Sequence, residues 1–127
     1  MNAMAKTSRD GAPVDIATMR QTIALLLPHE TAEPPTGEEL ATLTATLPGH
    51  IELAVQEVEQ LAARLPEDDI PRYCARACIG EARRKLSARP GPGPHDQLPH
   101  ARKLARSLLA LCDHYEALTA PAVAPAS

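Results

Sequence analysis

The sequence predicts an all-α protein, a four-helix bundle with disordered termini. The first indication is composition, because the 127 residues include 23 Ala and 16 Leu but no Phe or Trp. Ala and Leu favour helices, whereas aromatic and β-branched residues favour strands. The second is periodicity, since apolar residues recur three and four positions apart in four segments. The third is that clusters of Pro and Gly, which end helices, separate those segments.

The first predicted helix spans about residues 15–27. Asp15 is a favourable N-cap residue, since its carboxylate can accept hydrogen bonds from the first turn. Ile16, Met19 and Ile23 then follow at helical spacing. Pro28 ends the helix, because proline cannot continue the helical hydrogen-bond pattern.

The second predicted helix is long, about residues 37–65, and kinked near Pro48. Thr36 and Glu39 match the capping-box pattern, in which the hydroxyl of the first accepts from the amide of the second. The apolar stripe keeps its phase across Pro48, where a helix would normally break. One bent helix is therefore expected. The alternative is two helices joined by a tight corner.

The third and fourth predicted helices cover about residues 69–88 and 97–118. Apolar side chains of the fourth are spaced in a heptad-like pattern that ends near Leu118. Gly80, in the middle of the third, suggests close contact between these two helices, because glycine costs about 1 kcal/mol there relative to Ala. Residues 15–118 are thus expected to form one helical domain, with residues 1–14 and the Pro/Ala-rich residues 119–127 disordered.

Several classes of protein are disfavoured. The longest strongly apolar run, residues 23–27, is far shorter than the roughly 20 residues of a membrane-spanning helix. Residues 1–10 are polar, unlike the apolar region of a secretory signal. Three cysteines form no disulfide framework. A cytoplasmic location is therefore expected.

Charge is unevenly distributed along the chain. Residues 1–65 carry 4 basic and 9 acidic side chains, whereas residues 70–106 carry 9 basic and 2 acidic ones. Pairing with the acidic half or simple solvation is the favoured interpretation. The sharper hypothesis is an anion-binding or partner-binding surface. Its candidates are Arg72, Arg76, Arg83, Arg102 and Arg106. Nucleic acid is a less favoured partner, because the whole chain has a net charge of -3 and lacks a helix-turn-helix pattern.

The cysteines are expected mainly in the core, because they fall on the apolar arcs of their helices. A ligand pocket lined by Cys74, Cys78, Cys112 and Tyr115 is the alternative. These three thiols with His114 could also hold zinc, although the spacing is not that of common zinc sites. No metal, cofactor or catalytic residue is predicted.

Three segments carry a resemblance: residues 75–86 (ARACIGEARRKL), 100–106 (HARKLAR) and 110–116 (ALCDHYE). Over about residues 16–118 the chain resembles an actinomycete family of unknown function whose members carry the label "natural product biosynthesis protein". The resemblance implies a small intracellular protein linked to specialised metabolism, and it implies no reaction.

The function favoured by the sequence is that of a regulatory or adaptor protein acting through protein contacts. No constellation of catalytic side chains is visible, so an enzyme is disfavoured. A homodimer is compatible with the large apolar surface of the second and fourth helices. Two alternatives stay open: a small-molecule or metal-binding helper in a biosynthetic pathway, and a nucleic-acid-associated regulator that uses residues 70–106.

Overall fold

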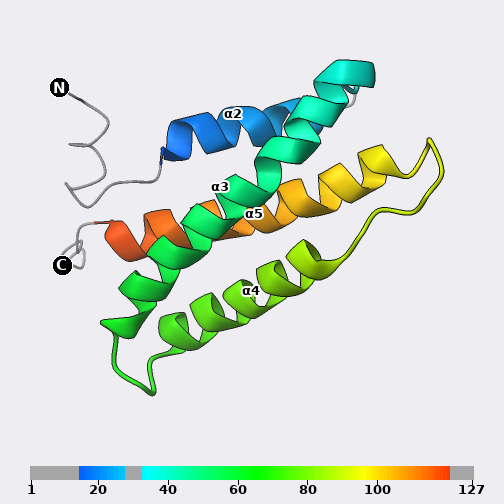
Figure 1. Cartoon of the computed structure of the whole chain (residues 1–127). Helices are drawn as coiled ribbons and strands as arrows, with labels where there is room; N and C mark the ends of the chain where they lie inside the picture. Colours follow the sequence, from blue (N-terminus) through cyan, green and yellow to red (C-terminus); the bar gives the residue numbers. More distant parts are fainter. Residues whose placement is uncertain (1–14, 28–32, 121–127) are drawn as a thin grey trace, which may run out of the picture.

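Four helices make up the computed structural model, which describes residues 15–27 and 33–120 (Figure 1). They are α2 (Ile16–Leu26), α3 (Gly37–Ala63), α4 (Ile70–Ser87) and α5 (Gln97–Thr119). The predicted all-α bundle is confirmed, and each helix end lies within two residues of its expected position.

The predicted disordered segments fall mostly outside the described residues. This applies to residues 1–14 and to 121–127 of the tail. Thr119, which the sequence pattern placed in the tail, is instead the last residue of α5. Its hydroxyl donates to the Tyr115 carbonyl, one turn earlier in the helix, at 2.8 Å.

Helices α3 and α5 form the centre of the bundle. Each contacts the other three helices, whereas α2 and α4 make no contact with each other within the described chain. Figure 1 shows α2 and α4 on opposite sides of α5, with α3 crossing over it. Helix α4 runs antiparallel to α5, so the start of one lies near the end of the other (Figure 1).

The core is aliphatic, as the absence of Phe and Trp requires. Burying each large side chain contributes about 2 kcal/mol from the removal of apolar surface from water. Buried alanines between them let the helices approach closely. The largest fully buried side chains are Met19, Leu26, Leu47, Ile51, Val58, Leu108, Leu111 and Cys112.

Helix α3 continues through Pro48 without interruption, so the alternative of two separate helices is wrong. Pro48 cannot donate a backbone hydrogen bond. Leu47 and Ile51 on either side of it are completely buried. Their packing against the rest of the core holds the helix together where its own hydrogen bonding is interrupted.

The two predicted N-caps differ in outcome. Asp15 caps α2 as expected, because its carboxylate accepts from the Thr18 amide at 3.1 Å and from the Thr18 hydroxyl at 2.7 Å. The predicted capping box of α3 is wrong, since the Thr36 side chain makes no cap hydrogen bond. Thr36 is extended, and Gly37 makes the turn into the helix with a φ of 58°.

Gly80 does not bring α4 close to another helix, so that expectation is also wrong. A Cβ atom built on Gly80 would meet only the Arg84 guanidinium, at 4.0 Å. Helix α4 packs into the core instead through Ala75, Ile79 and Ala82, which are buried, and through the half-buried Cys78 and Leu86.

None of the described helices combines the length and the hydropathy that crossing a membrane would need.

Candidate functional site

The five predicted anion-binding arginines do not form one cluster. Three of them make contacts that join parts of the fold. Arg72 donates from Nη1 to the Leu65 carbonyl at 2.9 Å, and Arg102 donates from Nε to the Leu26 carbonyl at 2.9 Å. Arg83 pairs with Glu59 of α3 at 3.2 Å.

The other two predicted arginines, Arg76 and Arg106, are exposed and have no ion pair within the described residues. They lie at different places. Arg76 lines a pocket at the start of α4, whereas Arg106 lines a groove between α4 and α5. Residues 70–106 therefore contribute to two separate surfaces, the pocket at the start of α4 and the groove between α4 and α5.

An ion-pair cluster that the sequence pattern did not single out joins α2 to α5. Arg20 Nη2 lies 2.9 Å from Asp113 Oδ1 and 2.8 Å from Glu116 Oε1. Hydrogen bonds to both carboxylates raise the pKa of Arg20 above its ordinary value. The available signal was the three-residue spacing of Asp113 and Glu116, which places both on one side of a helix.

The outward face of α4 carries large apolar side chains. Because α4 buries only the narrow stripe at Ala75, Ile79 and Ala82, its opposite side is open to solvent. Ile70 is 73% exposed and Tyr73 is 75% exposed. Single exposed apolar residues are common, but two adjacent ones on the first turn of a helix form a patch.

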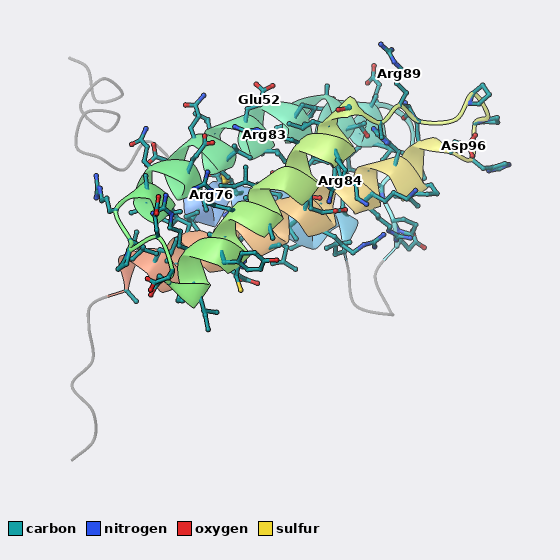
Figure 2. All side chains as sticks on the ribbon, turned by 90° about the horizontal axis from the view of Figure 1, so that it is seen from below. Glu52, Arg76, Arg83, Arg84, Arg89 and Asp96 are labelled. Carbon is teal, nitrogen blue, oxygen red and sulfur yellow. The ribbon has the colours of Figure 1, made fainter. Side chains whose placement is uncertain are left out.

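Basic side chains lie along both edges of this face. Figure 2 shows Arg76 and Arg83 on the side of α4 toward α3, and Arg84 on the side toward α5. A pocket of about 520 Å³ at the start of the helix is lined by Glu67, Arg72, Tyr73, Arg76 and Ala77.

A groove of about 470 Å³ lies between α4 and α5. Its lining combines basic, hydroxyl, thiol and imidazole groups with one carboxylate. Helix α4 contributes Cys78, Glu81 and Lys85, and α5 contributes Lys103, Arg106, Ser107, Ala110 and His114. None of the five predicted arginines except Arg106 lines it.

The three cysteines have different environments. Cys74 is exposed, contrary to the expected burial, Cys78 is half-buried, and Cys112 is buried as expected. Burial raises the pKa of the Cys78 thiol, and it raises that of Cys112 to about 11. Both thiols therefore stay protonated at neutral pH, which makes them poor nucleophiles.

The predicted ligand pocket and zinc site are not assembled as a unit. The α4–α5 groove includes Cys78 and His114, but its lining does not include Cys74, Cys112 or Tyr115. In the part of the chain that the structure describes, no three His, Cys, Asp or Glu side chains gather closely enough to hold a metal ion.

Comparison with known proteins places this chain in a family but not beside a characterised protein. No curated protein and no solved structure matches the sequence. One family model, described as a family of unknown function (DUF6415), matches residues 17–120. That range contains α5, α4 and α3 in full and all but the first residue of α2. The chain therefore belongs to the DUF6415 family of unknown function.

Proposed function

We propose that this protein is a non-enzymatic adaptor whose helix α4 pairs, through its outward face, with an acidic helix of a partner protein. The observation that carries the proposal is the exposure of the large apolar side chains of Ile70 and Tyr73 together on the first turn of α4. Tyrosine and arginine are enriched among residues that dominate protein interfaces. Tyr73 lies beside Arg76 in the pocket at the start of α4, which provides such a pairing.

The spacing of the outward residues suits a helical partner. Ile70, Tyr73, Ala77, Gly80 and Arg84 follow one another at intervals of three and four residues. This spacing produces a continuous stripe against which a second helix can pack. We call it the outer stripe. The outer stripe begins with large apolar residues and continues with the small residues Ala77 and Gly80, where the backbone of a partner helix can approach closely.

Gly80 supports the proposal because nothing in the fold of this chain requires a glycine at this position: its φ is not positive and no neighbouring helix approaches it closely. Glycine within a helix costs about 1 kcal/mol relative to alanine. A methyl group at this position would meet only the tip of the flexible Arg84 side chain. Close packing of a partner helix against α4 would explain why this position carries no side chain.

Charge favours an acidic partner over a second copy of this chain. Helix α4 carries five basic side chains and one acidic side chain, a net charge of +4. Pairing two α4 helices would bring these like charges together, whereas an acidic helix would be attracted.

The test compares capture of proteins from a lysate of the source organism by three immobilised chains. These are the wild type, Gly80→Leu, and the matched control Gly49→Leu on α3. Both glycines are helical, and a Cβ at either has no close neighbour. Both variants should therefore fold, but only Gly80→Leu places bulk on the outer stripe. A captured protein would then be purified and its affinity measured by calorimetry.

The expected result is a partner with an acidic helix that binds the wild type and Gly49→Leu equally. Its affinity for Gly80→Leu should fall by about tenfold or more, since the interface can no longer close. Equal affinity for Gly80→Leu would overturn the proposal. So would a wild-type homodimer that Gly80→Leu dissociates in analytical ultracentrifugation, because the occupant would then be a second copy.

A place in natural product biosynthesis, which the family resemblance implies, stays a prediction of the same kind. It is supported when the captured partner is a biosynthetic or regulatory protein of such a pathway. A partner from an unrelated process would contradict it.

A further inference from the structure

The groove between α4 and α5 has a polarity along its length. Because the two helices are antiparallel, Lys85 of α4 lies at the same end as Lys103 and Arg106 of α5. Cys78 lies toward the other end with Ala110 and His114. One end of the groove is therefore strongly basic, whereas the other end is lined by side chains of low polarity and a single imidazole.

At the basic end of the groove, positive side chains outnumber the carboxylates that could neutralise them. The groove is lined by three basic side chains and one acidic side chain, Glu81. Glu81 is already engaged by Arg84 and by Lys85, whose Nζ lies 3.0 Å from Glu81 Oε2. These contacts hold the pKa of Glu81 below its ordinary value, so it is ionised at neutral pH. Lys103 and Arg106 have no carboxylate partner within the described residues.

Ser107 is the second and independent observation. It is only 8% exposed and lines the groove, yet its hydroxyl makes no hydrogen bond to any described residue. Other helical hydroxyls here, such as those of Thr22, Thr44 and Ser87, donate to the carbonyl four residues earlier. A buried polar group without a partner is costly, by about 1–3 kcal/mol. A ligand in the groove would supply the missing acceptor.

We propose that the α4–α5 groove binds a small phosphate monoester with a short apolar body. The phosphate oxygens would lie between Lys103 and Arg106 and accept from the Ser107 hydroxyl. A phosphate monoester carries a charge of about -1.5 to -2 at pH 7, which matches the net +2 of the lining. The apolar body would extend toward Ala110 and Cys78. The groove volume of about 470 Å³ lies within the usual range of small-molecule sites.

This site is independent of the proposed adaptor surface. The groove lies on the α5 side of α4, whereas Ile70 and Tyr73 point away from the bundle. Burial raises the pKa of the Cys78 thiol, so this side chain is uncharged at neutral pH and contributes an uncharged surface to the groove rather than a nucleophile. The site is thus proposed to bind its ligand without transforming it.

The test uses hexyl phosphate as the probe and follows backbone amide shifts by NMR titration of the whole chain. Saturable shifts are expected at Ser107, Ala110 and Cys78. Hexanoate should bind about tenfold more weakly, because it carries one charge and fewer acceptor oxygens. Hexanol should not bind measurably.

Three variants separate a built site from general attraction to a basic surface. Arg106→Gln should raise the dissociation constant about tenfold, since it removes a charge-assisted hydrogen bond. Arg76→Gln is the charge-matched control, because Arg76 does not line the groove and Figure 2 places it on the side of α4 toward α3. It should leave the dissociation constant within about twofold, which is the effect of a distant charge screened by salt.

Ser107→Ala distinguishes a binding role from a structural one. Because the hydroxyl has no hydrogen-bond partner among the described residues, its removal should not lower the melting temperature. It should nevertheless weaken hexyl phosphate binding by about three- to tenfold. Equal weakening by Arg106→Gln and Arg76→Gln, equal affinity for hexanoate, or shifts confined to residues outside the groove would each overturn the proposal.

Discussion

At the scale of single residues, backbone conformation decides what each glycine does. Gly37 adopts a φ of 58°, which side-chain-bearing residues rarely take, and so makes the turn that starts α3. Gly49 lies in the same helix with a helical conformation and open space where a Cβ would be. The two glycines therefore have opposite consequences for stability although they are only twelve residues apart.

We expect Gly37→Ala to destabilise the fold by about 1 kcal/mol, because alanine is strained in the left-handed region. Gly49→Ala should stabilise it by about 0.5–1 kcal/mol, because alanine loses less backbone freedom on forming a helix. Urea denaturation of both variants and the wild type measures the difference. Shifts of the same sign would contradict this account of the two positions.

At the scale of elements, α2 is the helix with the least extensive packing against the rest of the bundle. It packs mainly against α5, makes limited contact with α3 and does not touch α4 within the described residues. Two arginine contacts reinforce this attachment. Arg20 joins α2 to Asp113 and Glu116 of α5, and Arg102 of α5 donates to the Leu26 carbonyl at the end of α2. Arg102 thus satisfies a carbonyl that the end of the helix leaves without a backbone partner.

Arg102→Ala should therefore release α2 locally. The lost charge-assisted hydrogen bond is worth roughly 1–3 kcal/mol. Hydrogen exchange should accelerate at the amides of α2, while the protection of α3 and α5 stays close to that of the wild type. Lys103→Ala is the matched control, since Lys103 is the exposed neighbour of Arg102 and lines the groove between α4 and α5. Unchanged exchange in α2 would show that Arg102 does not anchor it.

At the scale of the whole molecule, stability should depend on pH through two histidines. Partial burial lowers the pKa of His50 and of His100 below the ordinary value of 6.5. The carboxylate of Asp15 partly opposes this effect at His50, whereas Lys103 adds to it at His100. The unfolded chain consequently takes up protons at these positions at higher pH than the folded chain does.

The stability linked to these histidines is fully present above pH 6.5 and is lost as the pH falls toward their folded pKa values. We expect the melting temperature to decline between about pH 7 and pH 5, before the carboxylates protonate. In His50→Gln the decline should be shallower. An identical pH profile for the wild type and His50→Gln would refute the assignment to His50.

The helices of this protein are determined largely by local sequence. The spacing of apolar residues, the Pro and Gly clusters and the Asp15 cap placed all four helices, because these signals act between residues a few positions apart. The capping box of Thr36 failed because a match to a pattern does not specify the conformation of Gly37.

Only the tertiary structure decided how the basic and thiol side chains are used. Nothing in the sequence distinguishes Arg72, Arg83 and Arg102 from Arg76 and Arg106. In the structure the first three donate to a carbonyl or pair with a carboxylate elsewhere in the fold. Periodicity likewise placed Cys74 on an apolar arc, but α4 buries a stripe too narrow to include it. Such outcomes depend on which helices become neighbours, and that is settled by packing between residues far apart in the chain.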